Sequence, residues 1–474
     1  MADIVPLLIN NESIVTDTVF DVYNPATGQV AHRCAGASVD DARRAVDSAK
    51  AAFPAWSKTT PNARRDILLK AADIMLSRRE ELIAYQIEET GSQRPFAEKT
   101  FEMGAAFIKD FAARIPSIEG AVPSVSEQGE CAVVFKEPYG VILGIAPWNA
   151  PFILGTRAVL LPLAAGNTAI LKGSELSPKC FWALGDIFRQ AGLPDGCLQV
   201  LYHKVTDAPA VTEALIAHPA VRKISFTGST HIGAVVASLA GRYVKPVLLE
   251  LGGKAAAIVL DDANLERAAF NCALGAFMHS GQVCMSTERI IVQRGVAEKF
   301  RELLAGAAEK VFGQHTPAPV LVAAAAVSKN KALVADALAK GAEVVFGDAA
   351  ATEACGSSMR PLIVGNVTKA MDLYATESFG PTVSLMVVDS EEEAVALAND
   401  TEYGLSSAVF TDNLFRGLRV AKQIESGAVH INSLTIHDEA VLPHGGYKSS
   451  GFGRFGGAHG YDEWLQTKTV TWVE

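Results

Sequence analysis

The chain has 474 residues, of which 49% are hydrophobic and 20% charged, and its formal net charge is −10. This length and composition are typical of a folded globular protein with two or three domains, and they exclude a disordered chain. Because the basic residues are scattered through an acidic chain, nucleic acid is also excluded as an electrostatically bound partner.

The seven cysteines show neither a CxxC pair nor regular spacing. An odd number at low density predicts reduced thiols in the cytoplasm, not a disulfide framework or a zinc site. The first residues, Met1-Ala-Asp-Ile-Val-Pro6, lack the basic and apolar regions of a signal peptide. We therefore expect a cytoplasmic protein without a bound metal.

The first helices are predicted from apolar residues that recur at helical spacing. One covers Asp40–Phe53, and two more lie within Asn62–Glu89.

One uncharged stretch, Pro138 to Thr156, has 19 residues, close to the length that spans a membrane. Its Pro147 and Pro151 remove backbone hydrogen bonds that a helix in lipid would need. The stretch is therefore predicted to be a buried strand followed by an irregular loop, and no membrane contact is expected.

From residue 140 the chain changes to short apolar segments separated by helical ones. Strands are predicted at 141–145, 168–171, 198–202, 223–226 and 247–251, and helices at about 157–163, 178–191, 208–217 and 230–240. This repeated β-α-β order predicts a parallel, doubly wound sheet.

A second alternating series follows. Its predicted strands lie at 257–260, 289–293, 342–346, 361–364, 383–388 and 407–410, with helices at 264–276 and 296–311 among them. The chain therefore contains two α/β domains with a cleft between them. The segments 121–137 and 462–474 alternate polar and apolar residues, which predicts edge strands that pair in an oligomer.

Two glycine-rich segments are candidates for binding a nucleotide. Gly451-Phe-Gly-Arg-Phe-Gly456 has GxGxxG spacing, but no strand precedes it and no room remains for a β-α-β unit, so we interpret it as a loop lining a cleft. Ile224–Gly233 is the better candidate, because a strand runs through Gly228 into a helix. Ser229 could reach a phosphate at the N-terminus of that helix.

Lys172 and Glu175 follow an earlier predicted strand and supply a cation and a carboxylate. A carboxylate there can accept hydrogen bonds from a ribose diol and repels a 2′-phosphate, which favours NAD over NADP. A solvated loop is the alternative interpretation of these two residues taken alone.

Three further residues point to covalent catalysis. Cys284 is a thiol, Glu250 a carboxylate and Asn149 a side-chain amide, and each lies in Gly- or Pro-rich sequence. These are the groups that acyl transfer through a thioester requires, and the cleft would bring the thiol and the carboxylate together.

These segments resemble the aldehyde dehydrogenase superfamily over nearly the whole chain. The matching motifs, in the family's order and spacing, are Pro147-Trp-Asn149, Lys172 with Glu175, Phe226-Thr-Gly-Ser229, Glu250-Leu-Gly-Gly253, Gly281-Gln-Val-Cys284, Glu377-Ser-Phe-Gly-Pro381 and Gly445-Gly-Tyr-Lys448. The resemblance implies an α/β fold with a Rossmann-like NAD domain (1–120 and 138–250), a catalytic domain (251–461) and a small β element for oligomerisation (121–137 and 462–474). A homodimer or a dimer of dimers is implied.

The resemblance also implies the roles of individual residues. Cys284 is expected to be the nucleophile, Glu250 the general base that activates water, and Asn149 the amide that stabilises the oxyanion. We expect burial to raise the pKa of Glu250. The residues expected to bind NAD are Ile145, Pro147, Trp148, Lys172, Ser174, Glu175, Gly228, Ser229, Ile232, Leu251, Gly252, Glu377 and Phe379.

Within the family, the sequence around Arg157 and Cys284 is similar to the subgroup that oxidises aromatic aldehydes. Salicylaldehyde is the expected substrate, with benzaldehyde and vanillin as alternatives. Arg157 could bind a phenolate or form a structural ion pair. The expected pocket residues are Arg157, Phe152, Phe277, Val283, Met285, His444, Tyr447 and Phe452, of which His444 makes the mouth more polar than usual.

Three alternative functions were weighed. An aliphatic or semialdehyde dehydrogenase would need less aromatic bulk in the pocket. A cofactor-free cysteine hydrolase, with His279 or a distant histidine as base, would not need the dinucleotide residues. A non-catalytic protein on this fold should have lost Cys284 or Glu250, and both are present.

Overall fold

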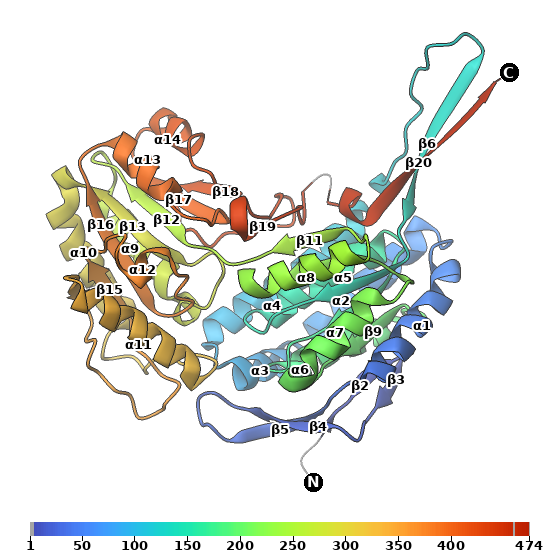
Figure 1. The fold of residues 1–474 in the computed structure, drawn as a ribbon, viewed down its shortest axis with the longest axis horizontal. Coiled ribbons are helices and arrows are strands. Elements are labelled where there is room, and N and C mark those ends of the chain that lie inside the picture. The colour runs from blue at the N-terminus through green and yellow to red at the C-terminus, as the bar shows by residue number, and fades with distance from the viewer. Residues whose placement is uncertain (1–3, 458–459, 474) are drawn as a thin grey trace.

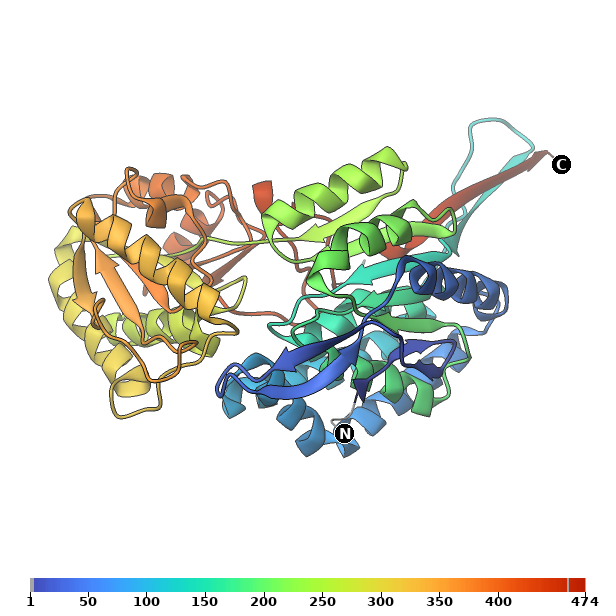
Figure 2. The same ribbon diagram turned by 60° about the horizontal axis from the view of Figure 1, so that its bottom comes forward.

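The computed structural model describes residues 4–457 and 460–473, with two large β-sheets in separate lobes and a projecting arm (Figure 1; Figure 2). Helices cover both large sheets, and the predicted α/β class is confirmed. Met1, the first residue of the segment tested for a signal peptide, lies outside the described residues, as do Ala2 and Asp3.

The first sheet has eight strands in the order β19-β11-β10-β7-β8-β9-β2-β3. Its five central strands are parallel, whereas β19, β2 and β3 run antiparallel to their neighbours. The strands are β2 (Leu7–Ile9), β3 (Glu12–Ile14), β7 (Val141–Ile145), β8 (Thr168–Lys172), β9 (Leu198–Leu201), β10 (Val221–Thr227), β11 (Val247–Glu250) and β19 (Gly451–Phe452).

Two layers of helices belong to this first lobe. Those in contact with the sheet are α1 (Val39–Trp56), α5 (Pro151–Ala164), α6 (Pro178–Ala191), α7 (Ala208–Ala217) and α8 (Thr230–Arg242). The helices α2 (Pro61–Ser77), α3 (Arg79–Thr90) and α4 (Arg94–Arg114) pack outside α5 and α6.

The second sheet has seven strands in the order β14-β15-β16-β13-β12-β17-β18, and all pairs but β14–β15 are parallel. The strands are β12 (Ala255–Val259), β13 (Thr287–Gln293), β14 (Glu343–Phe346), β15 (Leu362–Gly365), β16 (Thr382–Val388), β17 (Ser406–Phe410) and β18 (Ala428–Ile431). Its helices are α9 (Leu265–Phe277), α10 (Arg294–Phe312), α11 (Ala324–Ala339), α12 (Asp372–Ala375), α13 (Glu391–Asn399) and α14 (Leu414–Ala421).

Two smaller sheets complete the fold. The N-terminal one joins β1 (Ile4–Val5), β5 (Val30–Ala35) and β4 (Val19–Tyr23). The arm pairs β6 (Glu130–Pro138) with β20 (Leu465–Val473) in antiparallel register and extends away from both lobes (Figure 1). Its exposed side chains include Phe135 and Trp472, 47% and 46% accessible.

Most predicted elements lie where the sequence placed them, and α6 and α7 match their predicted ranges. The irregular loop expected up to Thr156 is shorter, because Pro151 begins α5 as its first residue. The strand predicted from residue 121 begins at Glu130. The N-terminal strands, α4 and β18 were not predicted.

The first two residues of the GxGxxG segment form a short strand, and the other four are irregular. Gly451 and Phe452 make up β19, which pairs antiparallel with β11 beside Glu250. Gly451 has φ +108°, and a Cβ atom there would lie 2.1 Å from the carbonyl oxygen of Leu249. The glycine is therefore required by a close backbone contact, and a segment expected in the catalytic domain adds a strand to the first sheet.

Within the described residues, none of the helices combines the length and apolar character needed to cross a bilayer.

A buried arginine fastens the second sheet to the end of α13. Arg289, on β13, is 1% exposed and donates to the carbonyl oxygens of Lys254, Leu397 and Ala398 at 2.8–3.1 Å. Two of these carbonyls belong to the last turn of α13, where a helix lacks its own hydrogen-bond donors. One side chain thus satisfies carbonyl groups from two segments, the loop before β12 and the end of α13.

Replacing Arg289 should destabilise the protein strongly. In Arg289→Met the three carbonyl oxygens lose the guanidinium donor while still buried, and that of Leu397 keeps its bond from the Asp400 N–H. We therefore expect the free energy of unfolding to fall by about 3–5 kcal/mol. Thermal and urea denaturation measure the loss. The matched control is Arg294→Met, whose exposed side chain pairs with Asp389 and should matter little. Equal melting of the two variants would contradict this account.

Candidate active site

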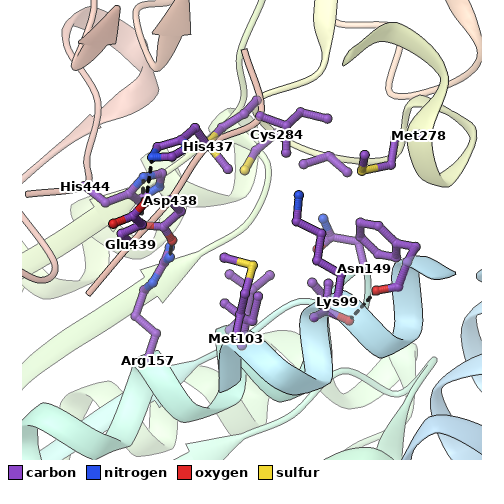
Figure 3. A pocket seen from close by; sticks show the side chains of 18 residues that line it. Lys99, Met103, Asn149, Arg157, Met278, Cys284, His437, Asp438, Glu439 and His444 are labelled. Carbon is purple, nitrogen blue, oxygen red and sulfur yellow. Dashed lines mark hydrogen bonds and ion pairs between the residues drawn. The ribbon is translucent and has the colours of Figure 1, made fainter. Parts of the chain in front are cut away.

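Two cavities meet at Cys284, in the cleft between the lobes. The first, drawn in Figure 3, has a volume of about 320 Å³ and the second about 260 Å³. Asn149, Leu154 and Cys284 line both cavities, and Glu250 lines the second. The three predicted catalytic side chains are therefore brought together.

An unusual turn presents Cys284 to both cavities. After α9, His279 and Ser280 adopt left-handed φ values of 50° and 58°, and Gly281 follows with 72°. Left-handed backbone costs about 1–2 kcal/mol for a residue with a side chain. At Gly281 a Cβ atom would lie 2.1 Å from the carbonyl oxygen of Gly380, so a glycine is required there. The turn reverses the chain before Cys284.

Glu250 ends β11, at the carboxyl edge of the first sheet, and its side chain is fully buried. The loop that follows passes directly against the Cys284 backbone. A Cβ atom at Gly253 would lie 2.4 Å from the carbonyl oxygen of Cys284. The Gly-Gly pair after Glu250 thus allows the carboxylate loop and the thiol loop to touch.

A buried ion pair joins these two loops to a third. Lys254 Nζ lies 2.7 Å from Glu288 Oε2 and donates to the carbonyl oxygen of Thr376 at 2.7 Å. The other oxygen of Glu288 accepts hydrogen bonds from the backbone N–H groups of Ser378 and Phe379, at 2.9 and 3.1 Å. The segments carrying Glu250, Cys284 and Glu377 are therefore held by one network.

Asn149 lies in the loop between β7 and α5 and is 4% exposed. Its Nδ2 donates to the carbonyl oxygen of Gln282 at 3.0 Å, two residues before Cys284. An amide nitrogen carries two hydrogens, so this bond fixes the side chain and leaves one N–H available beside the thiol.

Arg157 forms ion pairs with two acidic side chains. Its Nη2 contacts Asp438, and its Nη1 lies 3.5 Å from Glu250 Oε2. The guanidinium also lies over the rings of Phe107 and Phe455, at 5.8 and 5.2 Å. Of the two interpretations of Arg157, the ion pair is the one that the structure contains. The positive charge that would bind a phenolate is already balanced by Asp438 and Glu250.

His444 lies between the same two carboxylates. Its Nε2 is 3.9 Å from Glu250 Oε1, and its Nδ1 is 3.9 Å from Asp438 Oδ1. Figure 3 shows His444 and Arg157 on either side of Asp438 at one wall of the first cavity. Arg157, Asp438, His444 and Glu250 thus form a ring of four buried ionisable groups, called the ionic ring below.

The pKa of Glu250 differs from the expectation. Burial acts to raise it, as expected, but the neighbouring His444 and Arg157 act in the opposite direction and leave the pKa below its usual value. The sequence did not reveal that these two groups would surround the carboxylate. The ionised carboxylate is therefore the resting form at neutral pH.

The pKa values of Cys284, Arg157 and His444 are shifted mainly by burial. Burial and the charge of Glu250 raise the pKa of Cys284 well above its usual value. Burial lowers the pKa of Arg157, and burial together with the charge of Arg157 lowers that of His444. At neutral pH the thiol is thus protonated and the imidazole neutral.

The walls of the first cavity are largely apolar and come from both lobes. Val283, Met285, Arg157 and His444 line it as expected. Phe96 and Met103 of α4 were not expected there. Apolar residues at helical spacing can face either a cavity or the core, so the sequence did not indicate that these two line the cavity. The other unexpected lining residues are Lys99, Thr100, Ala150, Ile153, Leu154, Met278, Ile436, His437, Asp438 and Glu439.

Four residues expected in this pocket lie elsewhere. Phe152 is fully buried and packs edge-on against Phe101, and Phe277 packs against Phe312 in the core of the second lobe. Tyr447 and Phe452 are 48% and 52% exposed, and neither lines the first cavity. All residues of α5 are buried. The sequence therefore did not distinguish Phe152, which packs in the core, from the residues of the same helix that line the cavity.

The second cavity holds most of the residues expected to bind the dinucleotide. It is lined by Pro147, Trp148, Asn149, Leu154, Thr227, Gly228, Ser229, Glu250, Leu251, Gly252, Cys284, Lys329, Glu377 and Phe379. Lys329, on α11, was not predicted, and its Nζ donates to the carbonyl oxygen of Glu377 at 2.8 Å.

The second cavity fits a dinucleotide. β10 runs through Gly228 into α8. The Ser229 hydroxyl accepts a hydrogen bond from the backbone N–H of Ile232 in the first turn of this helix. A Cβ atom at Gly252 would lie 2.6 Å from a Glu377 oxygen, so small residues keep the cavity open there. Burial raises the pKa of Glu377 to about 7.

Five of the predicted cofactor residues are not among those that line this cavity: Ile145, Lys172, Ser174, Glu175 and Ile232. Ile145 is buried in β7, and Ile232 is 47% exposed on α8. Lys172 ends β8, and burial lowers its pKa while Glu175 raises it. Glu175 lines a separate depression with Lys204 and Val205.

His279 does not form a catalytic pair with Cys284 in the described part of the chain. Its ring stacks on Phe96 at 4.3 Å between centroids, and burial lowers its pKa to about 3. No hydrogen bond joins its ring to Cys284 among the described residues, so His279 does not supply the base that the cysteine hydrolase alternative needs.

Comparison with known proteins identifies the family. Residues 12–470 match the profile of the aldehyde dehydrogenase family. The chain is 44% identical to a vanillin dehydrogenase of Pseudomonas fluorescens over 474 residues, 98% of this chain and 97% of that protein.

Solved structures agree. A salicylaldehyde dehydrogenase from Pseudomonas putida G7, complexed with salicylaldehyde, superposes with a TM-score of 0.96 at 35% identity, covering 99% of this chain and 98% of that one. An NAD-dependent aldehyde dehydrogenase from Sinorhizobium meliloti superposes with a TM-score of 0.95 at 33% identity, covering 100% and 95%. Motifs, fold and paired cavities lead to one conclusion: this chain belongs to the aldehyde dehydrogenase family and is an oxidoreductase.

Proposed function

We propose that the enzyme oxidises benzaldehydes with ring oxygen substituents, such as salicylaldehyde and vanillin, to their carboxylic acids. The first cavity carries this proposal. Its walls beside Cys284 include Phe96, Met103, Ile153 and Met278, which suit a flat apolar ring. At one side, Asp438 and Glu439 can accept a hydrogen bond from a ring hydroxyl, and an N–H of His437 can donate to a hydroxyl or methoxy oxygen.

The vanillin dehydrogenases among the relatives, at 44% identity, support the same substrate class, as do the salicylaldehyde and benzaldehyde dehydrogenases. Succinate-semialdehyde dehydrogenases at 36–37% identity are also among them. A semialdehyde substrate would need a free cation for its carboxylate. The charge of Arg157 is balanced by Asp438 and Glu250, so Lys99, which lines the cavity and has no ion pair among the described residues, is the cation on which the semialdehyde alternative rests.

In the proposed first step, the Cys284 thiol gives its proton to solvent water and the sulfur attacks the aldehyde carbon. The carbonyl oxygen becomes an oxyanion, which the remaining N–H of Asn149 and the backbone N–H of Cys284 stabilise. Gly228, Ser229 and Glu377 of the second cavity would hold NAD, which would supply the acceptor for the hydride of this carbon. The thioester left on Cys284 then needs water.

Glu250 accepts a proton in the second stage, the hydrolysis of the thioester. Its carboxylate takes a proton from water while the water oxygen attacks the thioester carbon, which releases the acid and the Cys284 thiolate. Glu250 lines the second cavity together with Cys284, which supports this role. Its lowered pKa keeps the base ionised at neutral pH.

We also propose that the arm of β6 and β20 mediates a homodimer or a dimer of dimers. β20 pairs with β6 along one edge only, whereas the outer edge of β6 is bridged by Ala121 at Val134. Both strands carry exposed apolar side chains, among them Phe135 and Trp472, which favour pairing with a second copy. The seven cysteines, which show neither a CxxC pair nor regular spacing, suit a reducing compartment, the cytoplasm.

Glu250→Gln should separate the two chemical stages. Without the base, the thioester persists, so we expect one NADH per active site in a burst and subsequent turnover slower by about 10²–10⁴-fold. Rapid-mixing absorbance measures both phases, and Cys284→Ala, which should give no burst, is the control. Continued fast turnover would exclude Glu250 as the base.

The same variant should change the pH dependence of the burst. The charge of Glu250 helps to raise the pKa of Cys284, so the wild-type burst rate should increase with pH as the thiolate forms. Removing that charge lowers the pKa of the thiol, and the increase should occur at lower pH. A burst that is slower at every pH would instead indicate that Glu250 deprotonates Cys284.

Asn149→Ala should impair the first stage, since it removes one oxyanion donor. We expect the burst rate to fall by about 10²–10³-fold. Asn149→Asp, which keeps the size but adds negative charge, should be at least as impaired. A burst of normal rate in Asn149→Ala would show that the amide does not stabilise the oxyanion.

Arg157→Gln tests the phenolate interpretation. Because Asp438 and Glu250 balance the guanidinium, its loss should lower kcat/KM for salicylaldehyde and benzaldehyde by similar factors. Steady-state kinetics with the two aldehydes measure this. A loss that is tenfold greater for salicylaldehyde would restore the idea that Arg157 binds the ring oxygen.

A further inference from the structure

The carboxylate of Asp438 has two oxygens with different surroundings. Its Oδ2 contacts the guanidinium of Arg157 in the ion pair. Its Oδ1 lies 3.9 Å from Nδ1 of His444, which is too far for a hydrogen bond. No other group of the described residues donates a hydrogen bond to Oδ1, and this atom is not one of the fully enclosed polar atoms without a partner. A buried carboxylate therefore keeps one accessible acceptor.

This acceptor lies at the wall of the first cavity. Asp438 lines the cavity with a side chain that is 5% exposed, and Figure 3 shows it between His444 and Arg157. Both of these neighbours also lie beside Glu250, at 3.9 and 3.5 Å. An aldehyde whose ring fills the cavity during attack by Cys284 would therefore share that space with a buried acceptor that lacks a donor.

The ionic ring carries an excess of negative charge. It contains two carboxylates, Glu250 and Asp438, and Arg157 is the one cation that pairs with both. Burial and the charge of Arg157 lower the pKa of His444, so the neutral imidazole does not balance the second carboxylate. One negative charge thus stays uncompensated beside the cavity. It attracts a hydroxyl that donates a hydrogen bond, and it repels a phenolate and the lone pairs of a methoxy oxygen.

We propose that Asp438 determines specificity by accepting a hydrogen bond from a ring hydroxyl, so that the enzyme takes hydroxybenzaldehydes in their neutral phenol form. This rests on the proposed function, the oxidation of benzaldehydes with ring oxygen substituents, and narrows it to hydroxyl donors. A bare ring, a methoxy group or a phenolate leaves the acceptor of Asp438 without a donor. A site that hydrogen-bonds a substrate hydroxyl rejects analogues without it for this reason.

Two other charged side chains of the cavity are competing partners for a ring oxygen. Lys99, on α4, is exposed and has no ion pair among the described residues, and it would favour a phenolate. Glu439 is 56% exposed, and its Oε1 lies 3.2 Å from Nε2 of His437. Because water weakens hydrogen bonds to exposed groups more than those to buried ones, Asp438 is the stronger acceptor.

Asp438→Asn tests this assignment in the full-length enzyme. The guanidinium of Arg157 can only donate, so it should hold the amide oxygen and leave the amide N–H groups facing the cavity. The acceptor is thus exchanged for a donor at nearly constant size. Glu439→Gln is the matched control, because it makes the same chemical change at the exposed carboxylate next along the chain.

The measurement is kcat/KM for benzaldehydes that carry a hydroxyl, a methoxy or a fluoro group at the same ring position, in the ortho, meta and para series. Fluorine is smaller than a methoxy group and cannot donate, so it separates size from hydrogen bonding. We expect the wild type and Glu439→Gln to prefer the hydroxyl compound at one ring position by about 10–100-fold. Asp438→Asn should lose this preference. Each preference is a ratio, so a general loss of activity cancels.

The pH dependence of the preference distinguishes a bound phenol from a bound phenolate. The wild-type preference should fall as the hydroxyl of the aldehyde ionises, a transition that absorbance follows in the free compound. No such fall is expected in Asp438→Asn, because amide N–H groups can donate to a phenolate.

The groups around Asp438 keep one charge state over this range. The pKa values of Glu250 and His444 lie below their usual values, so the carboxylate stays ionised and the imidazole neutral above neutral pH. Titration of Cys284 changes the reaction of every aldehyde and cancels in the ratio. The facing charged and titratable groups are Arg157 of α5, Glu250 of β11, Lys99 of α4, His430 of β18, and His437, Glu439, His444 and Arg454 of the loops after β18 and β19.

Several results would overturn the assignment. They are a wild type that prefers the hydroxyl at no ring position, a preference that Asp438→Asn keeps, and a preference that Glu439→Gln loses. A wild-type preference that grows as the phenol ionises would also overturn it, since the phenolate would then be bound by a cation such as Lys99. The wild-type measurements do not depend on the folding of any variant. An enzyme that oxidises none of these benzaldehydes would instead overturn the proposed function.

Discussion

The buried ion pair between Lys254 and Glu288 is the interaction on which the arrangement of the site depends. Lys254 follows the Glu250 loop, and Glu288 lies four residues after Cys284. Glu288 also accepts hydrogen bonds from the backbone beside Glu377. Taking two charges out of water is costly unless each is fully partnered, and here the partners come from three loops. If any one of these loops moved, a buried charge would lose a partner and remain in an apolar environment. The three loops therefore hold one another in place.

Much of the site could be predicted from the sequence because its parts are local. Each of the three catalytic residues, Cys284, Glu250 and Asn149, lies in a short segment whose glycines or prolines are required by the local backbone geometry. Gly253 allows the backbone of Cys284 to approach, and Pro151 starts the helix after Asn149. The alternation of strands and helices likewise needs only neighbouring residues, which explains why α6 and α7 match their predicted ranges.

What could not be predicted depends on contacts between distant residues. Arg157 and Asp438 are separated by 281 positions, and no local pattern links them. The pKa of Glu250 is lowered by groups from two such distant segments, so burial alone gave the wrong direction. Phe152 and Phe96 are both aromatic residues on apolar helix faces. Only the packing of α4 against α5 decides that Phe96 lines the cavity and Phe152 fills the core.

The course of the chain between the sheets has a mechanical consequence. It passes from β11 to β12 just after Glu250, and it returns from β18 to β19, which pairs with β11 beside the same residue (Figure 1). Two covalent crossings close together restrict any rotation of one lobe against the other to an axis beside Glu250. Such a rotation would displace the outer cavity walls most and the Glu250 carboxylate least. The position of Glu250 at this axis would therefore limit any change in its distance from Cys284.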